Sequence, residues 1–377
     1  MKEVFIVADN IFSPLGQTTG DNFDTVLAGN TGIRQHQRPR MSAVSFYGSL
    51  FPEGTQLLPG NAGDYTQFEK LLIASITGAL QQTSIDITGS NTLLIISTTK
   101  GNISLLENAA IGPELLQRVS LSQSAAMVAK WFGLANKPLV VSNACISGLL
   151  ALLTGKRLIQ SGQYDHVVVA GADVISQFVL SGFQSFQAIS DGPCRPFDAA
   201  RNGINLGEGA GTILLTADKK YESGITLRGG ATSNDANHIS GPSRTGEELY
   251  QAISRAMEEA GVNKEEISFI SAHGTATIYN DEMEALAVSL AGLADTPINS
   301  LKGYYGHTLG AAGIIESVIA IQSLRQNKVP ASRGYHSSGV TKPLAVATGV
   351  QEGKYHYCLK TASGFGGCNA ALVFNKA

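Results

Sequence analysis

The feature that most constrains the fold is the alternation of wholly apolar strand segments with helical segments. Residues 92–97 and 166–170 predict strands with apolar residues on both faces, and residues 66–82 carry apolar side chains at helical spacing. Strands of this kind occur where helices cover both faces of a sheet. The chain is therefore expected to adopt an α/β fold.

The second half of the chain repeats the rhythm of the first, which predicts a duplicated α/β unit with halves at 1–218 and 219–377. Its expected elements are a helix at 247–260, a strand at 267–271, a helix at 281–291, a strand at 297–300, a helix at 308–327 and a closing hairpin of 355–360 with 369–374. In the first half we expect a strand at 3–8, helices at 21–28 and 122–132, and an irregular stretch at 34–63. Strands at 211–216 and 225–229 are expected to be adjacent.

Composition excludes several classes of protein. The chain has 377 residues and a net charge of −3 without basic runs, so nucleic acid is not an expected partner. The apolar stretch at 311–324 is interrupted by Glu316, so no membrane insertion is expected. Because the chain begins without an apolar signal segment, we expect a cytoplasmic protein whose four cysteines are free thiols.

Cys145 is the strongest candidate for a functional residue. It follows the apolar run Leu139–Val141 and opens a helical segment at 146–160, which places it at a strand-to-helix corner. A helix N-terminus lowers the pKa of a thiol, so we expect a thiolate here. His273 and His307 lie in glycine-rich segments further along the chain. A thiolate with two imidazoles indicates acyl chemistry on carbon, and therefore an enzyme.

Other interpretations of these residues were considered. Cys194, Cys358 and Cys368 are expected to be inert core residues, the usual role of a lone cysteine. Zinc is not expected, because no CxxC, HxxxH or HExxH spacing occurs. The glycine run at 207–211 is only a weak nucleotide-loop signal.

Five segments in order resemble the signatures of β-ketoacyl-acyl carrier protein synthases, the elongating condensing enzymes of the thiolase superfamily. The segments are SNACISG, RPFDAARNGINLGEGAG, SAHGTATIYNDEMEA, NSLKGYYGHTLGAAGIIE and SGFGGCNAALVF. The resemblance implies a thiolase-like fold, with two duplicated α/β halves forming a layered αβαβα core. It also implies decarboxylative Claisen condensation of an acyl thioester with malonyl-acyl carrier protein, in fatty acid or polyketide/aryl-polyene type synthesis. No bound cofactor is expected, since phosphopantetheine arrives on the carrier protein.

The resemblance assigns roles to the residues that match its motifs. Cys145 matches the nucleophile that accepts the acyl group. His273 and His307 match the pair that favours decarboxylation and stabilises the enolate. Lys302 matches an active-site lysine, which we expect to be tied to a carboxylate such as Glu284.

Further positions match substrate-binding and loop residues. Thr275 and Thr277 match threonines that bond the pantetheine arm, and the backbone N–H of Phe365 matches the partner of Cys145 in an oxyanion hole. Ser363 stands where many relatives carry phenylalanine in a gating loop. Its hydroxyl is expected to bond backbone in the turn at 364–367, leaving the loop less firmly held. Scaffold or loop anchors are expected at Asp198, Glu208, Asp281 and Asn369.

The resemblance also implies a dimer, with the strand at 166–170 at the subunit edge. The expected assembly is a homodimer or a heterodimer with a related subunit. Two alternatives to the condensing enzyme stay open. One is a non-catalytic or chain-length-setting subunit of a heterodimeric synthase. The other is a different thiolase-fold acyltransferase, since Cys368 lies in the region where thiolases carry a second catalytic cysteine.

Overall fold

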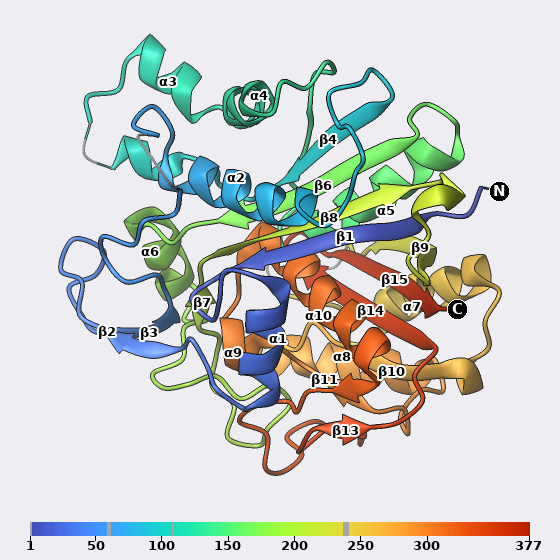
Figure 1. The fold of residues 1–377 in the computed structure, drawn as a ribbon. Helices are drawn as coiled ribbons and strands as arrows, with labels where there is room; N and C mark the ends of the chain where they lie inside the picture. Colours follow the sequence, from blue (N-terminus) through green and yellow to red (C-terminus); the bar gives the residue numbers. More distant parts are fainter. Residues whose placement is uncertain (1, 59–61, 108, 237–240) are drawn as a thin grey trace.

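A computed structural model describes residues 2–58, 62–107, 109–236 and 241–377 (Figure 1). Its main sheet has ten strands in the order β11-β10-β14-β15-β9-β1-β8-β6-β4-β5. These are β1 (Phe5–Phe12), β4 (Thr92–Ser97), β5 (Leu139–Val141), β6 (His166–Asp173), β8 (Gly209–Thr216), β9 (Ile225–Asn234), β10 (Ile267–Ser271), β11 (Ile298–Asn299), β14 (Tyr357–Gly364) and β15 (Cys368–Lys376). A three-stranded sheet consists of β2 (Arg34–His36), β3 (Phe46–Ser49) and β7 (Leu206–Gly207). A two-stranded sheet consists of β12 (Lys328–Val329) and β13 (Gln351–Glu352).

The helices are distributed over both halves of the chain. They are α1 (Thr19–Leu27), α2 (Gln67–Leu80), α3 (Pro113–Val119), α4 (Leu121–Trp131), α5 (Ser147–Gln160), α6 (Gln177–Ser185), α7 (Glu247–Ala260), α8 (Ile278–Leu290), α9 (Lys302–Tyr305) and α10 (Ala312–Gln326). Short 3₁₀ turns are η1 (Ile103–Leu106), η2 (Lys219–Tyr221), η3 (Lys264–Glu266) and η4 (Leu309–Ala311). None of the helices in the described ranges is long and apolar enough to cross a membrane.

The two halves of the main sheet repeat one pairing pattern. In β5-β4-β6-β8-β1 the first two contacts are parallel and the next two are antiparallel. The run β11-β10-β14-β15-β9 has the same sequence of contacts. β1 and β9 join the halves through the pair Phe5 and Thr226. The duplicated α/β fold is confirmed, while the division of the chain at residue 218 stays a prediction.

Helices cover both faces of the sheet in layers. α2 and α4 pack on the outer face of the first half, and α7 and α8 pack on the outer face of the second. α5 and α10 lie between the two halves (Figure 1). Their side chains, such as Leu152 and Ile314, share one core cluster with Leu372 of β15. The layers are therefore αβαβα, as the resemblance implies.

Several elements coincide with their predicted bounds because their end signals are local. α2 begins after Thr66, whose hydroxyl and backbone form a capping box with Glu69. α7 ends before Gly261, which adopts the left-handed conformation that terminates a helix. The strands β4 and β10 match their predicted ranges exactly at both ends.

Three expectations about the sheet are wrong. β8 and β9 are not adjacent, because β1 lies between them and pairs with both. β6, expected at a subunit edge, is an interior strand between β4 and β8; all its residues are buried, as in a central strand. The edge is β5. The stretch at 34–63 also contains β2 and β3, while its residues 59–61 lie outside the described ranges.

α5 and α10 cross at two glycines, each the second residue of its helix. A Cβ on Gly148 would lie 2.8 Å from the backbone N of Ile314 and 3.0 Å from Cα of Gly313. A Cβ on Gly313 would lie 2.8 Å from the backbone N of Leu149. Because these contacts are to backbone atoms, no side-chain movement relieves them. The absence of both side chains therefore sets how closely the two helix N-termini approach.

Gly148→Ala is expected to destabilise the protein by about 1–3 kcal/mol, since overpacking outweighs the gain in helix propensity. Gly182 of α6 is a matched control, because a Cβ there meets nothing within 4 Å. Gly182→Ala should stabilise the protein by about 0.5–1 kcal/mol. Urea unfolding of the two variants measures both effects. Equal effects of the two substitutions would contradict the tight crossing.

Candidate active site

Cys145, His273 and His307 come together from three separate segments. Cys145 lies between β5 and α5, His273 follows β10, and His307 precedes α10. One side-chain atom of each, the sulfur and two ring nitrogens, lies within 4.8 Å of the others. The exposed fractions are 8 % for Cys145 and 2 % for each histidine. The thiol and the two imidazoles that were predicted to act together therefore form one buried cluster.

The corner that carries Cys145 is a strained turn tied to the first residue of α5. Ala144 has a φ of 44°, which a non-glycine residue rarely adopts. The hydroxyl of Ser147 accepts from the N–H of Asn143 at 2.8 Å and donates to the carbonyl of Ala144 at 2.6 Å. These two bonds hold the backbone that aims the thiol, and strain held in this way is common at functional sites.

The thiol pKa is raised, contrary to the expectation of a thiolate. Burial raises the pKa of Cys145 to about 12, and the neighbouring Cys368 adds to the effect. Lys302 and a hydrogen bond from the backbone N–H of Phe365 act in the opposite direction but do not outweigh burial. Cys145 lies one residue before the N-cap Ile146, outside the first turn of α5. The resting cysteine is therefore a neutral thiol.

His307 is held by the glycine-rich segment before β8. Its backbone N–H donates to the carbonyl of Asn205 at 2.6 Å, and its carbonyl accepts from Gly207 at 3.0 Å. Its Nδ1 accepts from the backbone N–H of Leu309 at 3.1 Å. Nδ1 is then unprotonated, so the neutral ring carries its proton on Nε2, which has no protein partner among the described residues.

This tautomer bears on metal binding. The cluster of Cys145, His273 and His307 has the ligand types that zinc prefers. However, Nε2 of His307 can coordinate a metal only without its proton, and moving that proton to Nδ1 would break the bond from Leu309. The arrangement is better suited to donating an N–H than to holding a metal.

His273 is positioned through its backbone by Glu284 of α8. The two carboxylate oxygens accept from the N–H of His273 at 2.8 Å and of Gly274 at 2.7 Å. The ring lies edge-on to His307, with 5.2 Å between centroids. Burial lowers the pKa of both histidines well below the usual value, and Lys302 lowers both further. Both imidazoles are therefore neutral at neutral pH.

Lys302 is fully buried, but its expected pairing with Glu284 is wrong. Its ammonium forms an ion pair with Glu316 of α10 and donates to the carbonyl of His273 at 3.1 Å. Glu284 is already engaged by two backbone N–H groups and by the hydroxyl of Thr361 at 2.6 Å. The sequence alone does not show that Glu316 lies beside Lys302, because this contact depends on how α10 packs in the fold.

A second buried lysine, Lys360 of β14, was not among the predicted site residues. Its Nζ lies 2.9 Å from Glu316, so that one carboxylate serves two ammonium groups. The signal that could have revealed it is a lysine in the middle of a strand whose neighbours are otherwise apolar or small.

Thr275 and Thr277 lie beside the cluster at the start of α8. Their hydroxyls are 2.9 Å apart, and Thr277 is the N-cap residue of the helix. Asp281 accepts from the N–H of Thr275 at 2.9 Å and of Ala276 at 3.2 Å. The predicted anchoring role of Asp281 therefore agrees with its contacts.

The other predicted anchors also bond loop backbone. Asp198 accepts from the N–H groups of His336 and Ser337. Glu208 accepts from the N–H groups of Phe51 and Ile175. Each carboxylate thus joins segments that are distant in the sequence, which is what a scaffold role requires.

Ser363 is linked to the loop of Phe365 through the side chain of Asn369. It is buried in β14, and its hydroxyl donates to the side-chain oxygen of Asn369 at 2.7 Å rather than to backbone in the turn. The amide of Asn369 donates in turn to the carbonyl of Gly367 at 3.1 Å. The expected bond to backbone in the turn is wrong, because the hydroxyl bonds the side chain of Asn369 instead. That the loop is less firmly held than in relatives stays a prediction.

Phe365 is the most exposed of the predicted site residues, with an exposed fraction of 39 %. Its ring contacts Phe183 of α6 and the following Phe186, at centroid distances of 5.9 and 5.5 Å. Its backbone N–H bonds the sulfur of Cys145. One residue therefore connects the nucleophile to a partly exposed aromatic cluster.

Cysteines outside the cluster are all free and buried, but they differ in their surroundings. Cys358 lies in the core, and Cys194 donates to the carbonyl of Lys302 at 3.2 Å. Cys368 is not a remote core residue. It lies close to the nucleophile. A Cβ added to Gly364 would lie 3.0 Å from the sulfur of Cys368 and 2.9 Å from the backbone N of Cys145.

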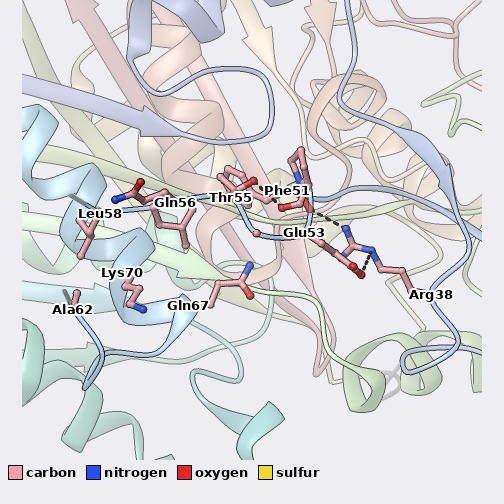
Figure 2. Close-up of a pocket in the computed structure, with 12 residues that line it drawn as sticks. Arg38, Phe51, Glu53, Thr55, Gln56, Leu58, Ala62, Gln67 and Lys70 are labelled. Atoms are coloured by element: carbon pink, nitrogen blue, oxygen red, sulfur yellow. Dashed lines mark hydrogen bonds and ion pairs between the residues drawn. The ribbon is translucent and has the colours of Figure 1, made fainter. Parts of the chain in front are cut away.

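An open cavity of about 440 Å³ lies apart from this cluster, beside α2. Figure 2 shows Arg38 at one end, bonded to Glu53 and to the carbonyl of Phe51, and Lys70 and Gln67 of α2 on another wall. None of the predicted site residues is among the described residues that line it.

Comparison with known proteins identifies the family. The model of the beta-ketoacyl synthase N-terminal domain matches residues 1–220, and that of the C-terminal domain matches residues 225–336. The 3-oxoacyl-[acyl-carrier-protein] synthase 2 of Vibrio cholerae is 28 % identical over 415 residues, covering 100 % of this chain and 99 % of that protein. The tetracenomycin polyketide synthase ketoacyl synthase alpha subunit of Streptomyces glaucescens is 29 % identical over 411 residues, covering 99 % and 96 %.

Solved structures agree with this assignment. A ketosynthase, ApeO, in complex with its chain length factor, ApeC, from Xenorhabdus doucetiae has a TM-score of 0.89 at 26 % identity, covering 100 % of this chain and 98 % of that one. The ishigamide ketosynthase/chain length factor has a TM-score of 0.91 at 25 % identity, covering 100 % and 99 %. The chain therefore belongs to the β-ketoacyl synthase family of condensing enzymes, which are acyltransferases.

Proposed function

We propose that the protein condenses an acyl thioester with malonyl-acyl carrier protein to give a 3-oxoacyl-acyl carrier protein, through an acyl-Cys145 intermediate. The observation that carries the proposal is the cluster of one thiol and two neutral imidazoles, with atoms within 4.8 Å. The pathway is a fatty acid or polyketide/aryl-polyene type synthesis. The relatives named above include both a 3-oxoacyl synthase and a polyketide ketosynthase.

The first step transfers the acyl group to sulfur. Cys145 loses its proton and attacks the thioester carbonyl, and the pantetheine thiol leaves with a proton. Because the resting thiol is neutral, ionisation must accompany attack. The N–H groups of Cys145 and Phe365 flank the sulfur and would bind the oxygen of the tetrahedral intermediate.

The second step forms the carbon–carbon bond. A malonyl thioester loses CO₂, the resulting enolate attacks the acyl carbonyl, and Cys145 leaves as the thiolate and recovers a proton. An enolate oxygen needs N–H donors, which the Nε2–H of His307 supplies directly and the neutral His273 supplies beside it. A cationic imidazole would cost more to bury than a neutral one does.

The carrier protein and its phosphopantetheine arm would be the partners in both steps. The paired hydroxyls of Thr275 and Thr277 are placed to accept or donate bonds to the arm. We propose no bound cofactor and no metal, since the arm arrives on its carrier and the locked tautomer of His307 disfavours coordination. We also propose a cytoplasmic location.

Intact mass analysis tests the acyl intermediate. After incubation with an acyl-acyl carrier protein, the wild type should gain the mass of one acyl group, and Cys145→Ala should gain none. The hydroxyl variant Cys145→Ser keeps the size of the side chain and controls for packing. No adduct with any acyl length would instead support a chain-length-setting subunit without catalysis.

A second candidate is a non-decarboxylative acyltransferase of the same fold, favoured by the sulfur of Cys368 close to the nucleophile. A synthase uses malonyl thioester and releases CO₂, while the alternative uses an acetyl thioester. Product formation from acetyl thioester at the same rate as from malonyl thioester would favour the second candidate.

The histidines should be separable from the nucleophile. His273→Ala and His307→Ala are expected to accept the acyl group on Cys145 but to lose condensation with malonyl-acyl carrier protein by about 10²–10³-fold, the usual cost of one oxyanion donor. Acyl loading is followed by mass and condensation by release of CO₂. Condensation at the wild-type rate in either variant would remove the assigned role.

We propose that β5 is a subunit edge, in place of β6. Within the described residues β5 pairs only with β4, and Leu139 has an exposed fraction of 42 %. An exposed apolar edge strand invites pairing. One solved structure similar to this chain is a ketosynthase, ApeO, in complex with its chain length factor, ApeC, which supports a second copy or a related subunit as the partner of this chain.

Leu139→Lys should weaken this assembly, because a charge on an edge strand opposes pairing. Light scattering of the purified chain should give a dimer for the wild type and a larger monomer fraction for the variant. Val350→Lys is the control, since Val350 is similarly exposed and lies outside the sheet edge. A wild type that stays monomeric at micromolar concentration would exclude the homodimer and leave a heterodimer with a related subunit.

A further inference from the structure

The ammonium group of Lys360 is surrounded by oxygen atoms. Its Nζ is fully buried and lies 3.1 Å from the carbonyl of Ser271, 3.2 Å from that of Ala272 and 2.7 Å from that of Thr361. With Glu316 at 2.9 Å, four oxygens surround the group. Burial lowers the pKa of this group, while the surrounding oxygens can accept from all three N–H donors of the ammonium.

Lys302 and Lys360 together hold three consecutive carbonyls at the end of β10. Lys360 contacts those of Ser271 and Ala272, and Lys302 contacts that of His273. Both ammonium groups meet the carboxylate of Glu316. The segment that leads into the candidate catalytic histidine is thus fixed by two cations that share one anion.

Lys302 and Lys360 act on the imidazoles as buried cations, while two buried carboxylates, Glu316 and Glu284, act on Lys360. Burial is the main cause that lowers the pKa of His273 and of His307; Lys302 and Lys360 lower both further, and His307 also lowers that of His273. Glu284 of α8 bonds the backbone of His273, and Asp173 of β6 accepts from Gly310 near His307.

We infer that Lys360 is a positioning residue that adds to the effect of burial and of Lys302 in keeping His273 and His307 neutral. It also holds the backbone that leads into His273, through the carbonyls of Ser271 and Ala272. The inference deepens the proposed function, in which both rings act as neutral N–H donors. Protonation of His307 on Nδ1 would also set its N–H against that of Leu309. The buried ammonium of Lys360 also disfavours that protonation.

The test is Lys360→Met, which removes the charge and keeps the length of the side chain. Without this cation the histidines protonate more easily, so their pKa values rise. The acid limb of condensation should therefore move to higher pH by on the order of one unit. Histidine NMR titration of the wild type and the variant measures the same shift directly, and does so without any substrate.

Lys156→Met is the matched control. Lys156 is also buried, with an exposed fraction of 1 %, and pairs with a single carboxylate, Glu259, at 2.5 Å. Loss of this buried lysine should lower stability without moving the acid limb or the histidine titrations. Unshifted titrations in Lys360→Met would overturn the inference and leave Lys360 with a purely structural role.

Two outcomes separate this inference from the proposed function. If the wild type shows no condensation but Lys360→Met raises the histidine pKa values, the proposed function fails and the positioning role stands. If Lys360→Met does not fold, titration of the wild type decides. A His273 or His307 that titrates near the ordinary value of about 6.5 would overturn the inference.

Discussion

The close crossing of α5 and α10 is the constraint on which the site depends. Gly148 and Gly313 occupy the same place in their helices, and each meets the backbone of the other helix without room for a side chain. α5 follows Cys145, and α10 follows the segment of His307. Any residue larger than glycine at the crossing would separate the two N-termini, and with them the thiol and the imidazole.

Around this crossing the protein holds three non-glycine residues in a strained backbone conformation. Ala144, Ala276 and Leu309 have positive φ values of 44°, 62° and 52° although none is glycine. Each lies within two residues of a predicted site residue, and a local hydrogen bond to a side chain ties each turn. Strain of this kind persists only where the surrounding structure determines the backbone. These turns keep their conformation because side-chain bonds hold them, rather than because their residues prefer it.

The sequence predicted well what depends on local signals. The bounds of α7 and β10 and the grouping of Cys145 with both histidines follow from periodicity, caps and motifs. It failed where spatial neighbours decide. The partner of Lys302 depends on which face of α10 turns toward β10 and β14, and the pKa of Cys145 depends on burial that a helix N-terminus does not reveal. β6 was misplaced because an apolar strand looks alike at an interface and in the middle of a sheet.

The duplicated scaffold carries unequal chemistry in its two halves. β4 and β10 are equivalent strands, and their last residues, Ser97 and Ser271, pair with Gly171 of β6 and Lys360 of β14 respectively. At Gly171 a Cβ would lie 2.9 Å from Ile314 of α10, so that position serves packing. At Lys360 the same position reaches the Glu316 carboxylate of the same helix. At this position one half thus places an apolar contact against α10, and the other places a cation against the Glu316 carboxylate. Because a duplication supplies equivalent backbone positions, substituting one residue of a pair is enough to make the two sides of a shared site chemically different.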